Sequence, residues 1–248
     1  MVSQIIFYAL LSVLIISIVS FVGVFTTLKN QKRLRKVLIY VISFSAGALL
    51  GDAFLHLLPG IGLEGRTPFY VLGGIVFFFV LEKVIHWQHC HSHITEEHHV
   101  HSFGYTNLIG DALHNFVDGS IIVASYLVSL PAGIATTVAV ALHEIPQEIG
   151  DVAVLIHAGF TKSRALMLNF ITALSAILGA VVTLVLTHQV DNLQNLLIPI
   201  SAGGFIYIAG SDLIPELHKH SDKLSRSFIQ LLTFLLGIAI MGLLLVFD

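Results

Sequence analysis

Two short stretches of the chain combine imidazole and carboxylate side chains at helical spacing. In the first, residues 111–119 (DALHNFVDG), His114 and Asp118 are four residues apart, so on a helix both project from one face. Asp111 extends that face by one turn. Imidazole and carboxylate together suit Zn²⁺ and other divalent first-row metals. This stretch therefore predicts one wall of a metal site.

The second stretch, residues 143–151 (HEIPQEIGD), carries two such pairs. His143 and Gln147 form one, and Glu144 and Glu148 form the other, one residue further round the helix. Two helices of this kind that face each other can enclose one metal ion, or two ions bridged by a carboxylate. We therefore expect the two stretches to pack together.

Pro146 lies inside the second stretch. Proline has no backbone N–H and bends a helix, so the carbonyl of Leu142, four residues earlier, should lack its helical partner. A freed carbonyl in a polar cavity can help to coordinate an ion or a water molecule.

The composition places these stretches in a membrane. Of 248 residues, 56% are hydrophobic and 11% are charged, against about 25% charged in an ordinary soluble domain. A soluble fold of this length needs a larger charged surface. The one cysteine, Cys90, excludes an intrachain disulfide, and no basic patch with interleaved aromatic residues supports nucleic-acid binding.

Eight segments are long and apolar enough to be membrane helices, which need about 20 such residues. The first lacks a basic leader and a small-residue cleavage site, so we expect a retained helix rather than a signal peptide. The sequence thus predicts an all-α membrane protein with one transmembrane domain over 1–248. The spans are 4–28, 36–58, 68–87, 105–128, 132–156, 164–187, 196–217 and 226–247.

Lysine and arginine indicate the orientation. Eleven of the twelve lie in or beside alternate connections, and only Arg66 lies on the other side. Because basic loops stay in the cytoplasm, we expect both termini outside and the loop 88–104 inside. The eleven are Lys29, Lys32, Arg33, Arg35, Lys36, Lys83, Lys162, Arg164, Lys219, Lys223 and Arg226.

Acidic residues, in contrast, lie inside the spans, where no lysine or arginine can pair with them. A charged side chain at a helix centre costs about 2.5–3.5 kcal/mol on the insertion scale. Such carboxylates must be protonated, contact water or face a cation, and a cation transporter needs the last two. They are Asp52, Asp111, Asp118, Glu144, Glu148, Asp151, Asp212 and Glu216.

Two other functions compete with transport. His143-Glu144-x-x-Gln147 is one residue short of the HExxH motif of zinc metalloproteases, so an intramembrane protease is the alternative. Gln147 breaks that motif, and Pro146 suits it poorly. A scaffold whose polar residues only join helices is the third reading, which the many unpaired acids disfavour.

With these stretches, the sequence resembles the ZIP (Zrt/Irt-like) family of divalent metal transporters. The resemblance rests on HNFVDG (114–119) and HEIPQEIGD (143–151), with GDAFLHLLP (51–59), SAGG (201–204) and DLIPE (212–216) in agreement. It implies a 3 + 2 + 3 arrangement in which the first and last three spans are inverted repeats. The tripeptide Ser-Ala-Gly occurs at 45–47 and again at 201–203.

The resemblance also implies the ligands. One metal site would use His114, Asp118, His143 and Gln147. A second would use Asn115, Asp118 and Glu144, with Asp118 as the bridge. Relatives mostly have His or Glu where this chain has Gln147, a weaker neutral ligand, which bears on the second metal and on the choice among Zn²⁺, Fe²⁺, Mn²⁺ and Cd²⁺.

The other polar positions would form the pathway. Asp52 and His56 resemble an outer relay, and Asp212 and Glu216 lie toward the inner exit, while Asp111, Glu148 and Asp151 extend the central face. The loop 88–104 can bind Zn²⁺ weakly or be merely solvated. Its candidate ligands are His89, His91, His93, His98, His99 and His101.

We therefore predict a permease that imports Zn²⁺ by alternating access, in the cytoplasmic membrane, with a homodimer as a plausible state. No ATP-binding motif supports direct ATP drive.

Overall fold

The computed structural model describes residues 2–27, 31–62, 64–89, 102–187, 189, 193–219 and 224–247, and these residues contain helices but no strand. The predicted all-α class is therefore confirmed for this part of the chain. Of the histidine-rich segment, His89 ends a helix, whereas His91, His93, His98, His99 and His101 lie outside the described residues.

The first half of the chain contains three long rods. They are α1 (Val2–Val19) with the 3₁₀ segment η1 (Ser20–Thr27), α2 (Gln31–Asp52) with the π-helical η2 (Ala53–Leu57) and α3 (Leu58–Ile61), and α4 (Thr67–His89). Two longer helices follow, α5 (Ser102–Val128) and α6 (Leu130–His157). Ser129 separates them and caps α6, because its hydroxyl accepts the N–H of Ala132 at 3.1 Å.

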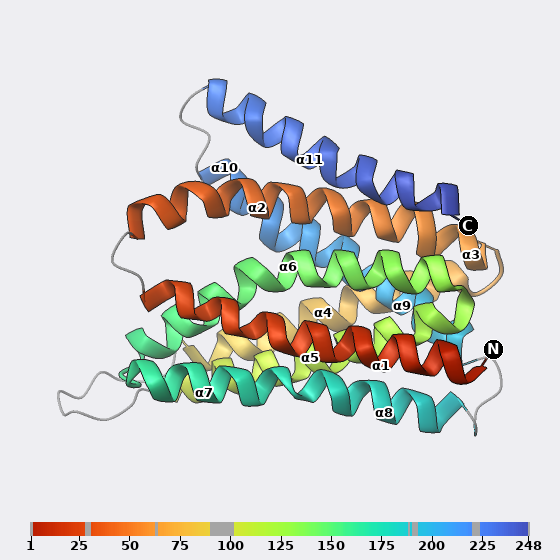
Figure 1. Cartoon of the computed structure of the whole chain (residues 1–248), viewed down its shortest axis with the longest axis horizontal. Helices are drawn as coiled ribbons and strands as arrows, with labels where there is room; N and C mark the ends of the chain where they lie inside the picture. Colours follow the sequence, from red (N-terminus) through yellow and green to blue (C-terminus); the bar gives the residue numbers. More distant parts are fainter. Residues whose placement is uncertain are drawn as a thin grey trace.

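The remaining elements are α7 (Lys162–Ala173), α8 (Ser175–Thr187), α9 (Gln194–Tyr207), the π-helical η3 (Ile208–Leu213), α10 (Ile214–Lys219), α11 (Leu224–Leu244) and η4 (Leu245–Phe247). The span expected at 164–187 thus consists of α7 and α8, which a turn at Leu174 separates. Both chain ends lie at the same end of the molecule (Figure 1).

Five of the expected spans coincide with described helices that are long and apolar enough to cross a membrane. These are Gln4–Val22, Lys36–Gly60, Lys162–Thr187, Gln194–His218 and Leu224–Leu244. Helices α5 and α6, with 27 and 28 residues, are long enough as well. Their histidine and acidic residues lower their hydropathy, and neighbouring helices cover them, so they need less apolar surface than a lipid-facing helix.

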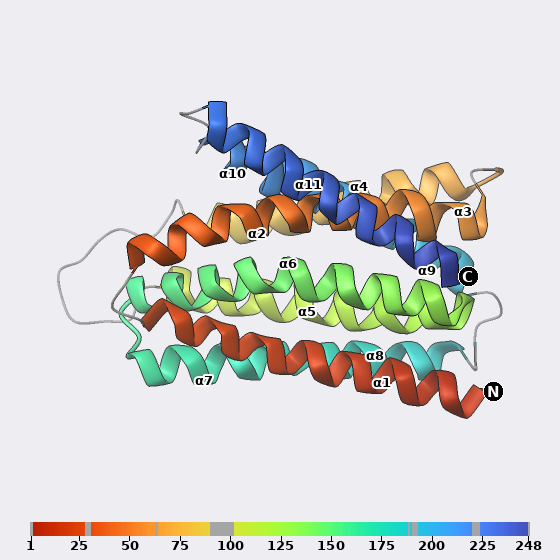
Figure 2. The same cartoon turned by 45° about the horizontal axis from the view of Figure 1, so that its top comes forward.

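The helices form two groups, which Figure 2 separates. In one group, α2 packs mainly against α11, and α4 against α9. In the other, α5 and α6 pack together, and α1, α7 and α8 lie against them. Helix α6 also packs on α2. The pair α5–α6 therefore has the helices α1, α7 and α8 on one side and the first group on the other.

Glycines allow close helix contact at matching places in the first group. A Cβ atom at Gly47 of α2 would lie 2.0 Å from the carbonyl oxygen of Phe234 in α11. One at Gly203 of α9 would lie 2.1 Å from that of Val71 in α4. These backbones touch only because no side chain separates them.

Two π-helical turns also occupy matching places. In η2 the N–H of Leu58 bonds the carbonyl of Ala53, and in η3 the N–H of Ile214 bonds that of Ala209. A proline follows directly in each case, at 59 and 215. Because proline cannot donate to the carbonyl four residues back, the helix widens to a five-residue bond before it.

Candidate metal site

Four ligand atoms from α5 and α6 meet in the middle of the bundle. His114 and Asp118 come from α5, and His143 and Glu144 come from α6. The Nε2 atoms of the two histidines are 3.2 Å apart. From His143 Nε2, Asp118 Oδ2 and Glu144 Oε1 each lie 3.4 Å away; from His114 Nε2 they lie 3.5 and 3.6 Å away. We call these four residues the central cluster.

The spacing of the central cluster fits a tetrahedral zinc ion. Zinc binds imidazole nitrogen and carboxylate oxygen at about 2.0–2.2 Å, so the ligand atoms of a regular tetrahedron are separated by about 3.3–3.6 Å. The five distances above run from 3.2 to 3.6 Å. The sixth separation, between the two carboxylate oxygens, is within 4.8 Å. The two imidazoles and either carboxylate are thus spaced as three corners of a zinc-sized tetrahedron.

Three carboxylate oxygens of the central cluster are buried without a hydrogen-bond partner among the described residues. Asp118 is 0% exposed and Glu144 is 1% exposed. Both carboxylate oxygens of Asp118, and Oε1 of Glu144, lack a hydrogen-bond partner among the described residues. Buried charge of this kind needs a compensating cation or a proton. A divalent ion would supply that compensation at the position the geometry favours.

Backbone and aromatic contacts orient the two imidazoles. Nδ1 of His143 lies 3.2 Å from the carbonyl oxygen of Ala139, so its proton is held on Nδ1 and the Nε2 lone pair is left for a metal. The ring of Phe78 packs edge-on against His114, and that of Phe205 against His143, at centroid distances of 6.1 and 6.2 Å. The cluster thus lies against apolar walls.

The carbonyl freed by Pro146 has a different partner from the expected one. Ser45 of α2 donates its hydroxyl to the Leu142 carbonyl at 2.6 Å. The carbonyl that we expected to be available to an ion or water molecule is thus hydrogen-bonded to a neighbouring helix.

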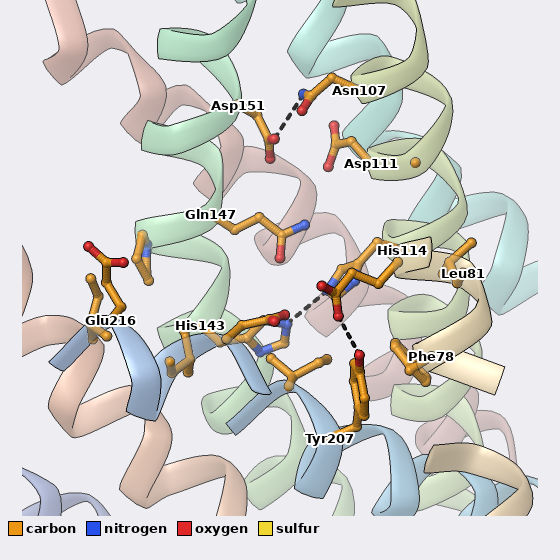
Figure 3. Close-up of a pocket in the computed structure, with 17 residues that line it drawn as sticks. Phe78, Leu81, Asn107, Asp111, His114, His143, Gln147, Asp151, Tyr207 and Glu216 are labelled. Atoms are coloured by element: carbon orange, nitrogen blue, oxygen red, sulfur yellow. Dashed lines mark hydrogen bonds between the residues drawn. The ribbon is translucent and has the colours of Figure 1, made fainter. Parts of the chain in front are cut away.

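Asn115 and Gln147, the two amides predicted as ligands, lie beside the cluster. Asn115 donates to Oδ1 of Asp111 at 2.8 Å, while its own buried Oδ1 lacks a partner. Gln147 lines a cavity next to the cluster, and Figure 3 shows its side chain between those of Asp151 and His143. Glu144, which was predicted for the second site, supplies the fourth ligand atom of the central cluster.

That cavity has a volume of about 390 Å³ and leads away from the central cluster. Its wall includes His114 and His143 at one end. Figure 3 shows several of its polar side chains. Four of the acids predicted for the pathway line it: Asp111, Asp151, Asp212 and Glu216.

Among these acids, Asp111 and Asp151 accept hydrogen bonds from side chains of α7 and α5. Asp111 accepts the hydroxyl of Thr172 through Oδ2, and Asp151 accepts the amide of Asn107 at 2.9 Å. Glu148 accepts the amide of Asn169 and is buried outside the cavity wall. Asp212 is exposed and accepts the hydroxyl of Ser211 at 3.0 Å.

Asp52 is the last residue of α2, and His56 lies in η2, which follows it. Both are buried. Asp52 accepts the hydroxyl of Thr136 on α6, and Nε2 of His56 lies 2.9 Å from the carbonyl oxygen of Met241. Neither residue lines the cavity beyond the central cluster.

Sequence reasoning missed several side chains that line the cavity. Glu82 accepts the hydroxyl of Tyr207, and both line it together with Asn107. Glu82 lies inside the expected span 68–87 and, as a carboxylate there, was detectable by the argument applied to the other eight. Tyr207 and Asn107 carried no comparable signal.

Comparison with known proteins gives a consistent result. A profile of the ZIP zinc transporter family matches residues 3–104 and 86–245. The chain is 37% identical to zinc transporter ZIP13 of Pongo abelii, over 82% of this chain and 65% of that protein. It is 32% identical to zinc transporter YKE4 of Saccharomyces cerevisiae (95% and 79%) and 31% identical to zinc transporter zipt-7.1 of Caenorhabditis briggsae (81% and 69%).

The chain belongs to the ZIP family. ZIP proteins are transporters rather than enzymes, so membership sets aside the metalloprotease interpretation of His143-Glu144-x-x-Gln147. It also establishes the chain as a membrane protein of the divalent metal transporter class. The apolar helices agree with this assignment.

Proposed function

We propose that this ZIP protein carries Zn²⁺ into the cytoplasm through the central cluster. The observation that carries the proposal is the set of four ligand atoms, which meet between α5 and α6 beside a cavity that four acids line. The name of the family and those of its relatives support zinc as the substrate. Fe²⁺, Mn²⁺ and Cd²⁺ are further candidates, because similar donors bind them.

The charges support an orientation in which the cavity faces the cytoplasm. The cavity is lined by the end of α4, the start of α5, the end of α6 and α10. These helix ends adjoin connections that carry half of the lysine and arginine residues, and basic connections belong in the cytoplasm. In this conformation the cavity thus opens inward, and the termini lie outside. Asp212 and Glu216 would meet the ion as it leaves.

We further propose eight membrane crossings in a 3 + 2 + 3 order, within one domain over 1–248. Matching features at an offset of 156 residues support it: Ser45 and Ser201, Pro59 and Pro215, and the two π-helical turns. The close contacts of Gly47 and Gly203 share this offset. Because the two copies run in opposite directions, such repeats suit alternating access by movement of one helix group against the other.

Part of the site could hold a second ion. Oδ1 of Asn115 and Oδ1 of Asp118 are both buried and lack hydrogen-bond partners. With Asp118 as a bridge, the two oxygens could contact an ion beside the first. Gln147 is neutral, so it would contribute less binding energy than an acid at that position.

The remaining assignments stay predictions. We keep the histidine-rich segment 88–104 as a cytoplasmic zinc-binding loop, the cytoplasmic membrane as the location, and a homodimer as a possible assembly. Localisation of a tagged chain and its mass in detergent would test the last two.

Uptake of Zn²⁺ into proteoliposomes that contain a zinc-sensitive dye tests the proposal. We expect His143→Ala to abolish uptake, since it removes one of four ligands. The matched control is His157→Ala, which changes an exposed histidine at the end of the same helix. Equal uptake in wild type and folded His143→Ala would refute the central cluster as the route.

A further inference from the structure

The hydroxyl of Ser45 lies between two helices. It is 2.8 Å from the carbonyl oxygen of Val41 in its own helix and 2.6 Å from that of Leu142 in α6. Ser45 is 0% exposed. A hydroxyl has one proton, and the shorter distance is the one to the other helix. The contact also joins the two helix groups, since α2 belongs to one and α6 to the other.

Leu142 occupies a sensitive position in α6. Its carbonyl would normally accept the N–H of residue 146, which is proline and has none. Without another donor this carbonyl would be unsatisfied at the point where the next two residues, His143 and Glu144, supply half of the central cluster. The hydrogen bond from Ser45 thus acts on the backbone that carries the ligands.

The repeat provides an internal comparison. Ser201 is the counterpart of Ser45 at the offset of 156, and it donates to the carbonyl of Leu197 in its own helix at 2.7 Å. Val41 and Leu197 are also related by that offset, so both serines make the same bond within their helix. The described bond of Ser201 stays within α9, whereas Ser45 also reaches α6.

We infer that Ser45 is a positioning residue of the metal site: its hydroxyl replaces the donor that Pro146 lacks and fixes His143 and Glu144 against α2 in the inward-open conformation. This inference rests on the proposed function of the central cluster. It gives one serine outside the ligand set a role in metal affinity. It also predicts that the role depends on the proline.

A double-mutant cycle tests this dependence. Ser45→Ala, Pro146→Ala, the double variant and the control Ser201→Ala are reconstituted, and the KM and maximal rate of Zn²⁺ uptake are measured. We expect Ser45→Ala to raise KM about fivefold, which corresponds to one hydrogen bond of ordinary strength, with little change in maximal rate. Ser201→Ala should match wild type. In the Pro146→Ala background, where the helix supplies the donor, Ser45→Ala should add nothing.

Three results would overturn the inference: an unchanged KM in Ser45→Ala, an equal rise in Ser201→Ala, or the same rise with and without Pro146. If Ser45→Ala fails to fold, recovery of folded protein by Pro146→Ala supports the inference and absence of recovery contradicts it. Undiminished uptake in His143→Ala is a different result, because it refutes the central cluster itself.

Discussion

Thr136 of α6 donates its hydroxyl to Oδ2 of Asp52 on α2, at 2.8 Å, and both side chains are 0% exposed. Thr136 precedes His143 by about two helical turns, whereas the cavity begins at His143 and extends the other way along α6. The hydrogen bond therefore joins the two helix groups on the side of the central cluster that faces away from the cavity. If the cavity faces the cytoplasm as proposed, an outward-open conformation would have to break this contact.

Loss of this bond should shift the protein away from the conformation described here. In Thr136→Val, a buried carboxylate oxygen loses its donor, at a cost of about 1–3 kcal/mol in this state. We expect a cysteine placed at Leu213, on the cavity wall, to react more slowly with a maleimide in detergent. Cys90→Ser would serve as the background for this measurement.

The matched control is Thr137→Val. Thr137 donates to the carbonyl of Gly133 within α6, at 2.7 Å, and makes no described bond to α2. Equal labelling rates in the two variants would mean that the Asp52–Thr136 contact does not hold the cavity open.

Zinc uptake should weaken as the pH falls. His114 and His143 present Nε2 to the ion, and a proton that occupies the same lone pair removes the ligand and adds positive charge. We expect KM to rise as the pH on both sides is lowered, because protons compete with the ion for these lone pairs. His157→Ala should retain the wild-type profile. A KM independent of pH would contradict binding by these imidazoles.

Three residues of the central cluster, His114, Asp118 and His143, were predicted together for one metal site, and Glu144 was predicted for the second. That these residues bind a metal stays a prediction. The i, i+4 spacing of His114 and Asp118 and the adjacency of His143 and Glu144 are properties of single helices, and acids without basic neighbours identify a polar interior. The grouping of the four atoms was less predictable. Whether Glu144 or Gln147 meets the other three depends on how α6 is rotated against α5, which only tertiary packing decides.

The sequence could not predict which side chains of distant helices form hydrogen bonds with one another. The freed Leu142 carbonyl followed from Pro146, but its bond to Ser45 depends on the position of α2. Asn169 and Thr172 gave no signal, because one amide and one hydroxyl in an apolar span are common as helix contacts. The π-helical turns could have been expected at Pro59 and Pro215, which lack the donor that a regular turn requires.

Two adjacent glycines of α4 should respond differently to substitution by alanine. A Cβ at Gly74 would lie 2.1 Å from the carbonyl oxygen of Ile200, whereas one at Gly73 would meet no atom within 4 Å. Gly74→Ala must push α4 away from α9, so we expect a clear loss of thermal stability or of folded protein. Gly73→Ala should melt like wild type. Similar melting of both variants in detergent would refute the close α4–α9 contact.

The buried pair Glu148–Asn169 predicts a compensating pair of variants. Asn169 of α7 donates to Oε2 of Glu148 on α6, and both are 1% exposed. Asn169→Leu keeps the volume but leaves the carboxyl group without its donor, which should cost about 1–3 kcal/mol. Removing both partners with apolar residues of similar shape is nearly neutral by the same principle.

We therefore expect Asn169→Leu alone to lower the melting temperature, and the double variant Glu148→Met/Asn169→Leu to recover most of the loss. Thermal unfolding in detergent, followed by the fluorescence of a thiol-independent dye, measures both. If the two substitutions destabilise additively, Glu148 acts through a partner other than Asn169, because independent sites add and coupled sites do not.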